Sequence, residues 1–288
     1  MYVITELTDE NISLFTEYID EDMVENIERT NYFGLAAVDD FGKVKATMLW
    51  QYKNLELDVD NESLIEWIRA DEPEAFTRMI DVYRVMALEN EVVTSKVVIP
   101  VKDGKELKAL LKKVGFDMRL SESNLITVKL SELSDSAFMK KMRGKKIPGS
   151  VKTLKEIPPR MFRDGIAKCL TKGRTGLCDD LGDLYIQWFE MDVSTVSTGE
   201  NGVNGLFLFH KKPSGLITVQ LMVSLDSNDK SLLPMLIYRF VSAMEEKYSP
   251  DRKVTFDRHN EQVLMLAEKL LPRGFGIPVY VGSRQEEL

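Results

Sequence analysis

The chain has 288 residues, a formal net charge of −8 and 44% hydrophobic residues, which is the composition of a globular protein long enough for two domains. Its apolar runs are shorter than the roughly 20 residues that cross a bilayer. Its start lacks the basic and apolar segments of a secretion signal. From these features we expect a cytoplasmic protein and not one that spans a membrane.

The charges are distributed unevenly along the chain. Residues 1–138 hold 28 acidic and 15 basic side chains, residues 139–150 hold five basic and no acidic ones, and residues 151–288 hold 18 of each. We therefore predict an acidic N-terminal domain at 1–138, a basic linker at 139–150 and a C-terminal domain at 151–288. An acidic half repels a phosphate backbone, so we expect no nucleic-acid partner.

In the first half, residues 34–50 have the pattern of a strand hairpin, and residues 63–70, "SLIEWIRA", are interpreted as an extra helix. A helix with Pro73 in its first turn is predicted within 71–90. After a strand that starts at Lys96, an apolar stripe predicts a helix up to Gly115, a residue suited to the left-handed position beyond a helix end. Residues from Phe116 through "NLITVKL" at 124–130 are expected to close the same sheet.

The second half repeats this order. Residues 184–197 are interpreted as a strand, and residues 205–223 as a hairpin that leaves His210 exposed. Residues 228–248 are interpreted as a helix with an early proline. A strand from Lys253 and a helix over "HNEQVLMLAEKLLPRGF" follow, and "GIPVYVG" is expected to close the second sheet. The repeat predicts two tandem α/β domains, each a central mixed sheet flanked by helices.

Two cysteines and a glycine-rich stretch carry little chemistry of their own. Cys169 and Cys178 have no histidine near them in the sequence, so we predict reduced structural thiols rather than a disulfide or a zinc site. The stretch at 171–184, "TKGRTGLCDDLGDL", does not match a phosphate-binding loop. It is interpreted as a connection or as a lid over a cleft.

The end of each repeat resembles the last helix of the GNAT superfamily of acyl-coenzyme A N-acyltransferases, which often reads N-x-x-A-x-x-L-Y-x-x-x-G-F. The matching positions are Asn260, Leu266, Gly274 and Phe275 in the second half, and Leu110, Gly115 and Phe116 in the first. The preceding hairpin, helix and strand extend the resemblance over most of the chain. It implies a tandem GNAT-like protein that takes acetyl-coenzyme A or another acyl-coenzyme A and acylates a small-molecule or peptide amine.

The resemblance also implies where the cofactor would bind. In the superfamily a glycine-rich turn before a helix holds the pyrophosphate through backbone N–H groups. That place reads "SLDSNDKSLLPML" here, without glycine. We therefore expect any cofactor site in the C-terminal half to be built from Val223, Leu225, Lys230, Ser231 and Asn260, with Lys230 as the first phosphate contact. A simpler interpretation is that Asp229 only caps the helix.

The catalytic groups are harder to assign. Glu190, beside Trp188 and Phe189, is our candidate for the base that deprotonates the amine. The position of the superfamily's proton-donating tyrosine holds Ala267 in the second half and Leu111 in the first, and neither can transfer a proton. The resemblance implies an acyl-coenzyme A-dependent N-acyltransferase. The alternative is a catalytically inactive ligand-binding or interaction protein of the same fold, which the missing tyrosine and glycine-rich turn favour.

Overall fold

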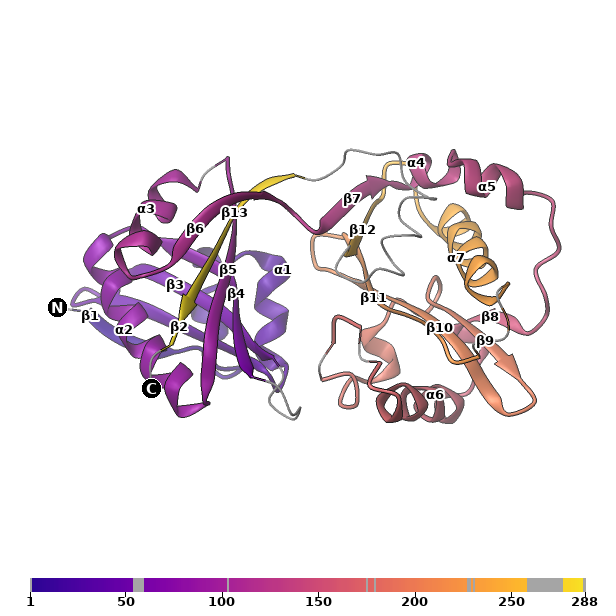
Figure 1. Cartoon of the computed structure of the whole chain (residues 1–288), viewed down its shortest axis with the longest axis horizontal. Helices are drawn as coiled ribbons and strands as arrows, with labels where there is room; N and C mark the ends of the chain where they lie inside the picture. The colour runs from indigo at the N-terminus through magenta and orange to yellow at the C-terminus, as the bar shows by residue number, and fades with distance from the viewer. Residues whose placement is uncertain are drawn as a thin grey trace. The chain divides into compact units, whose positions relative to one another are not determined.

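The structure is a computed structural model that describes residues 2–53, 60–102, 104–174, 176–178, 180–226, 229, 231–257 and 277–286. They form two compact units, one of Met1–Ser123 with Ile277–Leu288 and one of Asn124–Gly276. Each unit has a mixed β-sheet flanked by helices (Figure 1). The predicted fold class, two tandem α/β domains, is confirmed.

The N-terminal unit contains a seven-stranded sheet in the order β1-β2-β3-β4-β5-β13-β6. All neighbouring strands are antiparallel except β4 and β5. The strands and the helices of four residues or more are β1 (Tyr2–Glu6), α1 (Glu21–Val24), β2 (Tyr32–Asp39), β3 (Val44–Lys53), β4 (Asn61–Ala70), α2 (Pro73–Glu89), β5 (Val92–Pro100), α3 (Lys105–Lys113), β6 (Asp117–Glu122) and β13 (Pro278–Gln285).

Two apolar layers hold the N-terminal unit together. α2 buries Phe76, Met79 and Tyr83 against one face of the sheet, as its 3.6-residue spacing predicts. The short helical turns between β1 and β2 cover the other face, with Ile12 and Phe15.

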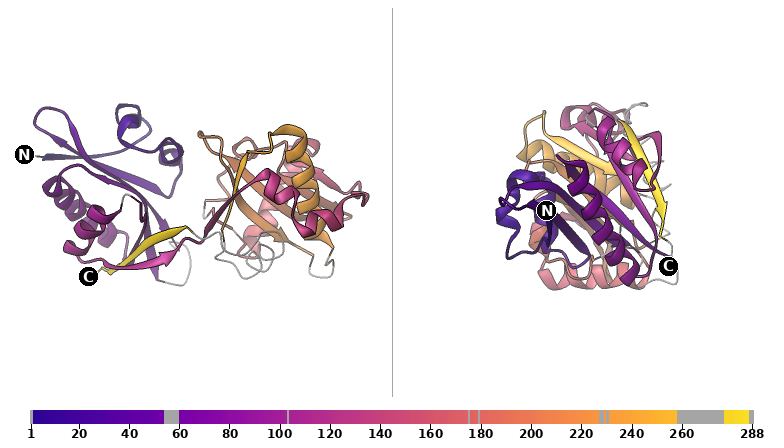
Figure 2. Two further views of the ribbon diagram at one scale, coloured as in Figure 1. Left: turned by 90° about the horizontal axis from the view of Figure 1, so that it is seen from above. Right: turned by 90° about the vertical axis from the view of Figure 1, so that its left-hand side faces the viewer.

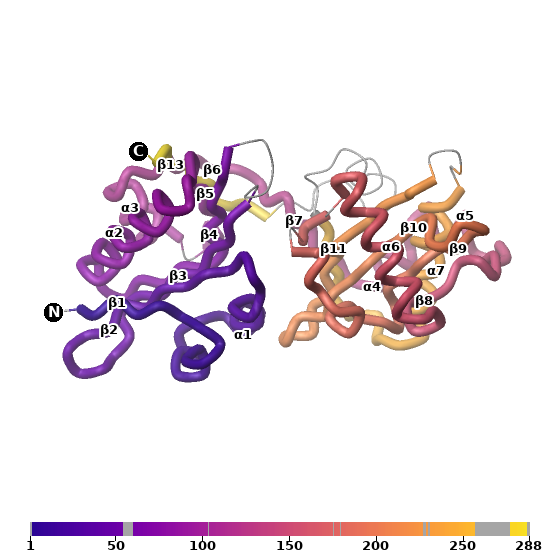
Figure 3. The backbone as a smooth tube through the Cα atoms, turned by 90° about the horizontal axis from the view of Figure 1, so that it is seen from below, coloured from indigo at the N-terminus to yellow at the C-terminus, as the bar shows by residue number. Residues whose placement is uncertain are grey.

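The C-terminal unit contains a six-stranded sheet in the order β7-β12-β11-β10-β9-β8, in which only β11 and β12 pair in parallel. Its elements are β7 (Leu125–Lys129), α4 (Leu130–Ser134), α5 (Ala137–Met142), β8 (Val151–Thr153), α6 (Pro159–Thr171), β9 (Thr195–Gly199), β10 (Gly202–Lys211), β11 (Ile217–Ser224), α7 (Leu232–Lys247) and β12 (Lys253–Asp257). α6 packs on β10 over one face (Figure 3), and α7 covers the opposite face through Leu236 and Phe240.

The closing strands are exchanged between the repeats, which corrects the sequence-based expectation. β7, from the end of the first repeat, pairs with β12 of the C-terminal unit. β13, from the end of the chain, lies between β5 and β6 of the N-terminal unit, and both views of Figure 2 show this yellow strand beside magenta β6. The predicted strands are therefore present, but each completes the other repeat's sheet. The alternation of apolar and polar residues marks a segment as a strand but does not say which other strand it pairs with. The sequence pattern therefore did not reveal the exchange.

This exchange also moves the boundary between the units. The N-terminal unit consists of the chain up to Ser123 and again from Ile277 onward. The sequence had predicted that the N-terminal domain ends at residue 138 and that the C-terminal domain begins at residue 151. The expected basic linker at 139–150 lies within the C-terminal unit. Its first residues belong to α5, which buries Met139 and Met142.

The stretch interpreted as an extra helix is a strand. β4 covers Asn61–Ala70 and is held by β3 on one side and β5 on the other, and this pairing overrides its helix-like spacing. The strand–helix–strand series β3-β4-α2-β5 thus corresponds to β10-β11-α7-β12. The first predicted hairpin, 34–50, is β2-β3 and is offset by one strand from its supposed copy at 205–223.

The helix that ends the first repeat is confirmed. α3 buries Leu111, and Gly115 has a φ of +94° just beyond the helix. Phe116 is buried behind it. The second copy, at 259–275, lies outside the described residues, and so does Ala267. Leu111 is fully buried in the core, so the position of the superfamily tyrosine has only a packing role in the first repeat.

Among the described residues, no helix combines the length and apolar character needed to cross a membrane. Cys169 and Cys178 are both buried thiols outside any disulfide, as predicted. Burial raises the pKa of the Cys169 thiol to about 11, so this thiol is protonated at neutral pH.

Candidate functional site

The parallel strands of the C-terminal unit separate soon after they pair. β11 and β12 are in register only at Ile217 with Val254 and Thr218 with Thr255, and β11 then continues to Ser224. β4 and β5 of the N-terminal unit behave in the same way, because their pairing ends at Ile65 with Val97 while β4 continues to Ala70. Backbone groups beyond such a divergence need other partners, from the chain or from a ligand.

Each diverging strand carries a β-bulge at this point. In β11 the extra residue is Gln220, between Val219 opposite Phe209 and Leu221 opposite Leu208. In β4 it is Glu66, between Ile65 opposite Trp50 and Trp67 opposite Leu49. The two units therefore carry an amide and a carboxylate at corresponding positions, which local sequence patterns did not predict. A bulge is recognised only when both strands of a pair are aligned.

In the C-terminal unit, the glycine-rich stretch folds onto this bulge. The Leu177 N–H donates to the Gln220 carbonyl oxygen at 2.8 Å, and the Cys178 thiol lies 3.1 Å from Gln220 Oε1. Gly176 adopts a φ of +68°, and a Cβ placed there would lie 2.2 Å from the Gln220 oxygen. The stretch is thus a loop docked on the bulged strand.

The two units differ most in how the diverging strand reaches the next helix. In the N-terminal unit only Asp71 and Glu72 join β4 to α2, and Glu72 accepts hydrogen bonds from Lys45 and Tyr2. In the C-terminal unit the longer connection Leu225–Ser231 joins β11 to α7. Because backbone N–H groups must surround a phosphate, the longer connection is the better anion-binding candidate.

The predicted cofactor residues fall along this strand and connection. Val223 is buried beneath α6 and Leu225 is partly buried against the same cluster. The Leu225 N–H donates to the Asn204 carbonyl oxygen at 2.8 Å, and Lys172 Nζ donates to the Leu225 carbonyl oxygen at 2.9 Å. The structure thus places Val223 and Leu225 together and adds Lys172, a positive charge that the sequence did not connect to this place.

Ser231 is engaged by Asp229. The Ser231 hydroxyl and N–H both donate to Asp229 Oδ1, at 2.6 and 2.9 Å, and these bonds lower the pKa of the Asp229 carboxyl. The N-cap position of α7 is Ser231 and has no side-chain cap hydrogen bond, so Asp229 holds the residue before the helix rather than capping the helix, which corrects the simpler interpretation. Lys230 and Asn260 lie outside the described residues and stay sequence-based predictions.

A cavity of about 300 Å³ lies elsewhere on the C-terminal unit, lined by Gln187–Glu190, His210 and Lys211. It contains the predicted base, Glu190, which follows a 3₁₀ helix at Ile186–Trp188 rather than lying on the expected strand. Its carboxylate accepts from Lys247, which also bonds Asp192 at 2.5 Å. Hydrogen bonds from Lys247 and Lys155 lower the pKa of the Asp192 carboxyl.

Glu190 does not lie near the predicted phosphate turn. Lys247, its partner, ends α7, and Ser231 precedes the first residue of the same helix. At 1.5 Å per residue, the two ends are about 24 Å apart. Any reaction that uses Glu190 therefore takes place away from the connection that would hold a phosphate.

His210 was expected to be exposed, and this prediction is wrong. Its side chain is buried with 6% exposure, and its ring stacks on Trp188 with 3.9 Å between centroids. Nδ1 lies 2.6 Å from the Trp188 carbonyl oxygen. His210 follows Leu206 and Leu208 at two-residue spacing, so strand alternation could have placed it on their buried face.

No protein-family model and no curated protein matches the sequence. Solved structures do match it. A tandem GNAT protein from the clavulanic acid biosynthesis pathway superposes with a TM-score of 0.64 and 11% identity, over 100% of this chain and 99% of that one. A conserved protein of unknown function from Bacteroides thetaiotaomicron superposes with a TM-score of 0.58 and 11% identity, over 99% of this chain and 100% of that one. A GCN5-related N-acetyltransferase from Sphaerobacter thermophilus superposes with a TM-score of 0.52 and 9% identity, over 100% of this chain and 96% of that one.

These similarities define the class of structure. The chain has the fold of a tandem GNAT protein, and the resemblance drawn from the sequence is confirmed at the level of the fold. In both units the parallel strands diverge and a helix joins them, α2 between β4 and β5 and α7 between β11 and β12.

Proposed function

We propose that the protein is an acyl-coenzyme A-dependent N-acyltransferase whose cofactor binds along β11 of the C-terminal unit. The observation that supports this most is the divergence of β11 from β12, followed by the long connection Leu225–Ser231 to the start of α7. The N-terminal unit has the divergence but only a two-residue acidic connection. We assign it a structural role.

The residues present fit the apolar part of an acyl-coenzyme A better than its phosphates. Leu221 and Val223 are buried beneath α6, and the partly buried Leu225 just beyond β11 is the apolar side chain that a cofactor could contact there. Asp229 already accepts the Ser231 N–H, so the phosphates would depend on Lys172 and Lys230 rather than on a backbone cradle. When bound, the cofactor supplies a thioester as the acyl donor.

His210 and Glu190 are the candidate groups on the acceptor side, because both line the 300 Å³ cavity. A carbonyl oxygen only accepts hydrogen bonds, so His210 Nδ1 must carry the proton that is shared with Trp188. In the neutral ring the lone pair is then on Nε2, the form that a base needs to deprotonate an amine. Glu190, held by Lys247, is the second candidate.

The tautomer of His210 can be tested without a substrate. We expect long-range ¹H–¹⁵N NMR to find neutral His210 protonated at Nδ1, because the Trp188 carbonyl oxygen accepts that proton. The chain has only one other histidine, His259, so a His210→Gln variant assigns the signals. A proton on Nε2 of the neutral ring would contradict the proposed base.

Cofactor binding is the central test of the function. Acetyl-coenzyme A at 100 times its Kd should raise the free energy of unfolding by about 2.7 kcal/mol. Lys230→Glu should weaken binding about tenfold, because it replaces a charge-assisted phosphate contact by repulsion. A thermal-shift titration measures both effects.

Lys113→Glu provides the matched control, since it makes the same charge change on exposed α3 of the N-terminal unit. Its titration curve should match that of the unmodified protein. A protein that shows no shift at millimolar acetyl-coenzyme A would favour the alternative, a non-catalytic ligand-binding or interaction protein. The loop docked on Gln220 is the observation that supports this alternative, because it occupies part of the bulged strand.

A further inference from the structure

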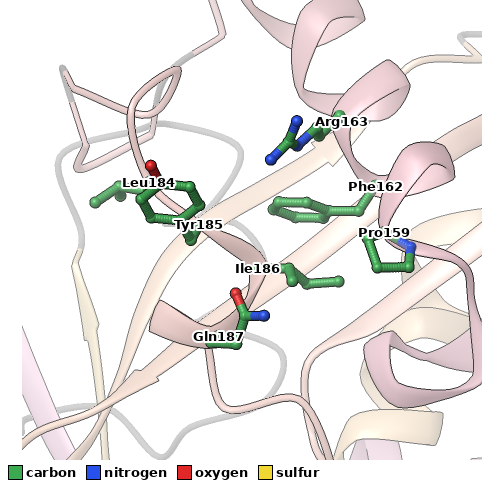
Figure 4. Close-up of a pocket in the computed structure, with 7 residues that line it drawn as sticks. All are labelled: Pro159, Phe162, Arg163, Leu184, Tyr185, Ile186 and Gln187. Atoms are coloured by element: carbon green, nitrogen blue, oxygen red, sulfur yellow. The ribbon is translucent and has the colours of Figure 1, made fainter.

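A second, smaller cavity lies beside the one that contains His210. It has a volume of about 110 Å³ and lies between the start of α6 and the segment Leu184–Gln187 (Figure 4). Both cavities are lined by Gln187, so they adjoin. Neither the fold nor the proposed cofactor position assigns a role to it.

The lining of this cavity has two chemical parts. Its apolar part is made by Pro159, Phe162, Leu184 and Ile186. Its polar part consists of Arg163, Tyr185 and Gln187, and Figure 4 shows the Arg163 guanidinium extending from α6 toward the segment that bears Leu184 and Tyr185. Such a site suits a small molecule with one apolar end and one anionic group.

Arg163 is available for an anion. It has no hydrogen bond or ion pair within the part of the chain that the structure describes, unlike Arg239, which pairs with Glu156. A guanidinium presents parallel N–H groups that match the two oxygens of a carboxylate. Tyr185 lines the same cavity and is 70% exposed.

The volume limits the apolar group. A cavity of 150 Å³ accommodates benzene and one water takes about 30 Å³, so 110 Å³ accommodates roughly three or four carbon atoms. A short branched aliphatic group meets this limit, whereas an indole or a long acyl chain exceeds it.

We propose that this cavity is the acceptor subsite, and that the acceptor is a small amine bearing a carboxylate and a short branched aliphatic group, as in an aliphatic amino acid. The inference rests on the proposed function, because it assigns the amine to the adjoining cavity with His210. The aliphatic group fills the smaller cavity and the carboxylate pairs with Arg163. Amide formation then joins the amine nitrogen to the acyl carbon as the carbon–sulfur bond breaks, with the amine proton leaving to the base and the thiolate departing.

Direct binding of L-leucine to the full chain tests this subsite without turnover. Isothermal titration should give a Kd for L-leucine at least tenfold lower than for isopentylamine, which lacks the carboxylate. Arg163→Gln should weaken L-leucine at least tenfold and leave isopentylamine unchanged. Arg160→Gln, at an exposed position of the same helix and outside the cavity, is the control and should change neither Kd.

Two controls show whether weaker L-leucine binding reflects loss of the site or loss of the fold. Circular dichroism should show Arg163→Gln folded, and Leu184→Trp should block L-leucine by filling the cavity. If Arg163→Gln binds L-leucine as tightly as the unmodified protein, or if isopentylamine binds equally well, the carboxylate site is wrong. Acetyl-coenzyme A titration of the same samples separates the two proposals. L-leucine binding without a cofactor shift overturns the acyltransferase, and a cofactor shift without L-leucine binding overturns only the subsite.

Discussion

Replacing Arg284 by methionine should lower the free energy of unfolding of the N-terminal unit by about 3–5 kcal/mol. Arg284 lies on β13 and Glu286 follows its last residue, and their side chains are 7% and 1% exposed. The guanidinium donates to Glu286 Oε1 at 2.6 and 2.9 Å and to the Val114 carbonyl oxygen at 3.1 Å. Without it, a buried carboxylate and the end of α3 both lose their partner. Hydrogen exchange in urea, followed by mass spectrometry, measures the effect in each unit separately.

The double variant Arg284→Met/Glu286→Leu is the decisive control. Removing both charges leaves no unpaired carboxylate, so its stability should return to within about 1–2 kcal/mol of the original. Lys129→Met breaks an exposed pair with Asp251, whose side chain is 82% exposed, and should cost less than about 1 kcal/mol. An Arg284→Met protein as stable as the double variant would mean that the pair is not buried in solution.

Gly176→Ala should release the loop from β11 and destabilise the C-terminal unit by about 3 kcal/mol. The left-handed backbone costs any other residue about 1–2 kcal/mol, and the new Cβ would lie 2.2 Å from the Gln220 oxygen and 3.0 Å from Leu221 Cα. Both contacts are with backbone, which cannot rotate away. The hydrogen bonds of Leu177 and Cys178 to Gln220 are then lost, and Cys178 becomes accessible.

Gly173→Ala is the matched control in the same loop. Gly173 also has a positive φ, +61°, but nothing lies within 4 Å of its Cβ position. It should therefore show the backbone cost alone. Peptide mapping after thiol labelling should find Cys178 modified at least tenfold faster in Gly176→Ala than in Gly173→Ala, with buried Cys169 as internal reference. Equal rates at Cys178 would argue against docking of the loop on β11.

The local elements were predictable where local chemistry determines them. α2, α3 and α7 follow from their apolar stripes, and the stop after α3 follows from Gly115 and Phe116. β4 was not predictable in this way, because Leu64, Ile65 and Ile68 suit a helix face and a strand alike. Its two neighbouring strands decide between them.

The candidate site was predicted only in part, for a related reason. Val223 lies on β11 and Leu225 follows its last residue, in an order of strand and helix that is visible in the sequence, and their role in cofactor binding stays a prediction. Glu190 was chosen for its apolar neighbours, but its partner Lys247 is 57 positions away in the chain. Long-range ion pairs leave no periodic signal, and neither does the contact of Gly176 with Gln220.

The sequence by itself determined two similar α/β repeats, the helices α2, α3 and α7, the helix stop at Gly115 and the acidic character of the first half. Only the tertiary structure decided that β7 and β13 change places, that Glu66 and Gln220 form the bulges, and that His210 and Arg163 line adjoining cavities. The physical reason is the range of the interactions. Helix periodicity and capping act within a few residues, whereas strand pairing, bulges and cavities arise between segments that meet only when the sheets close.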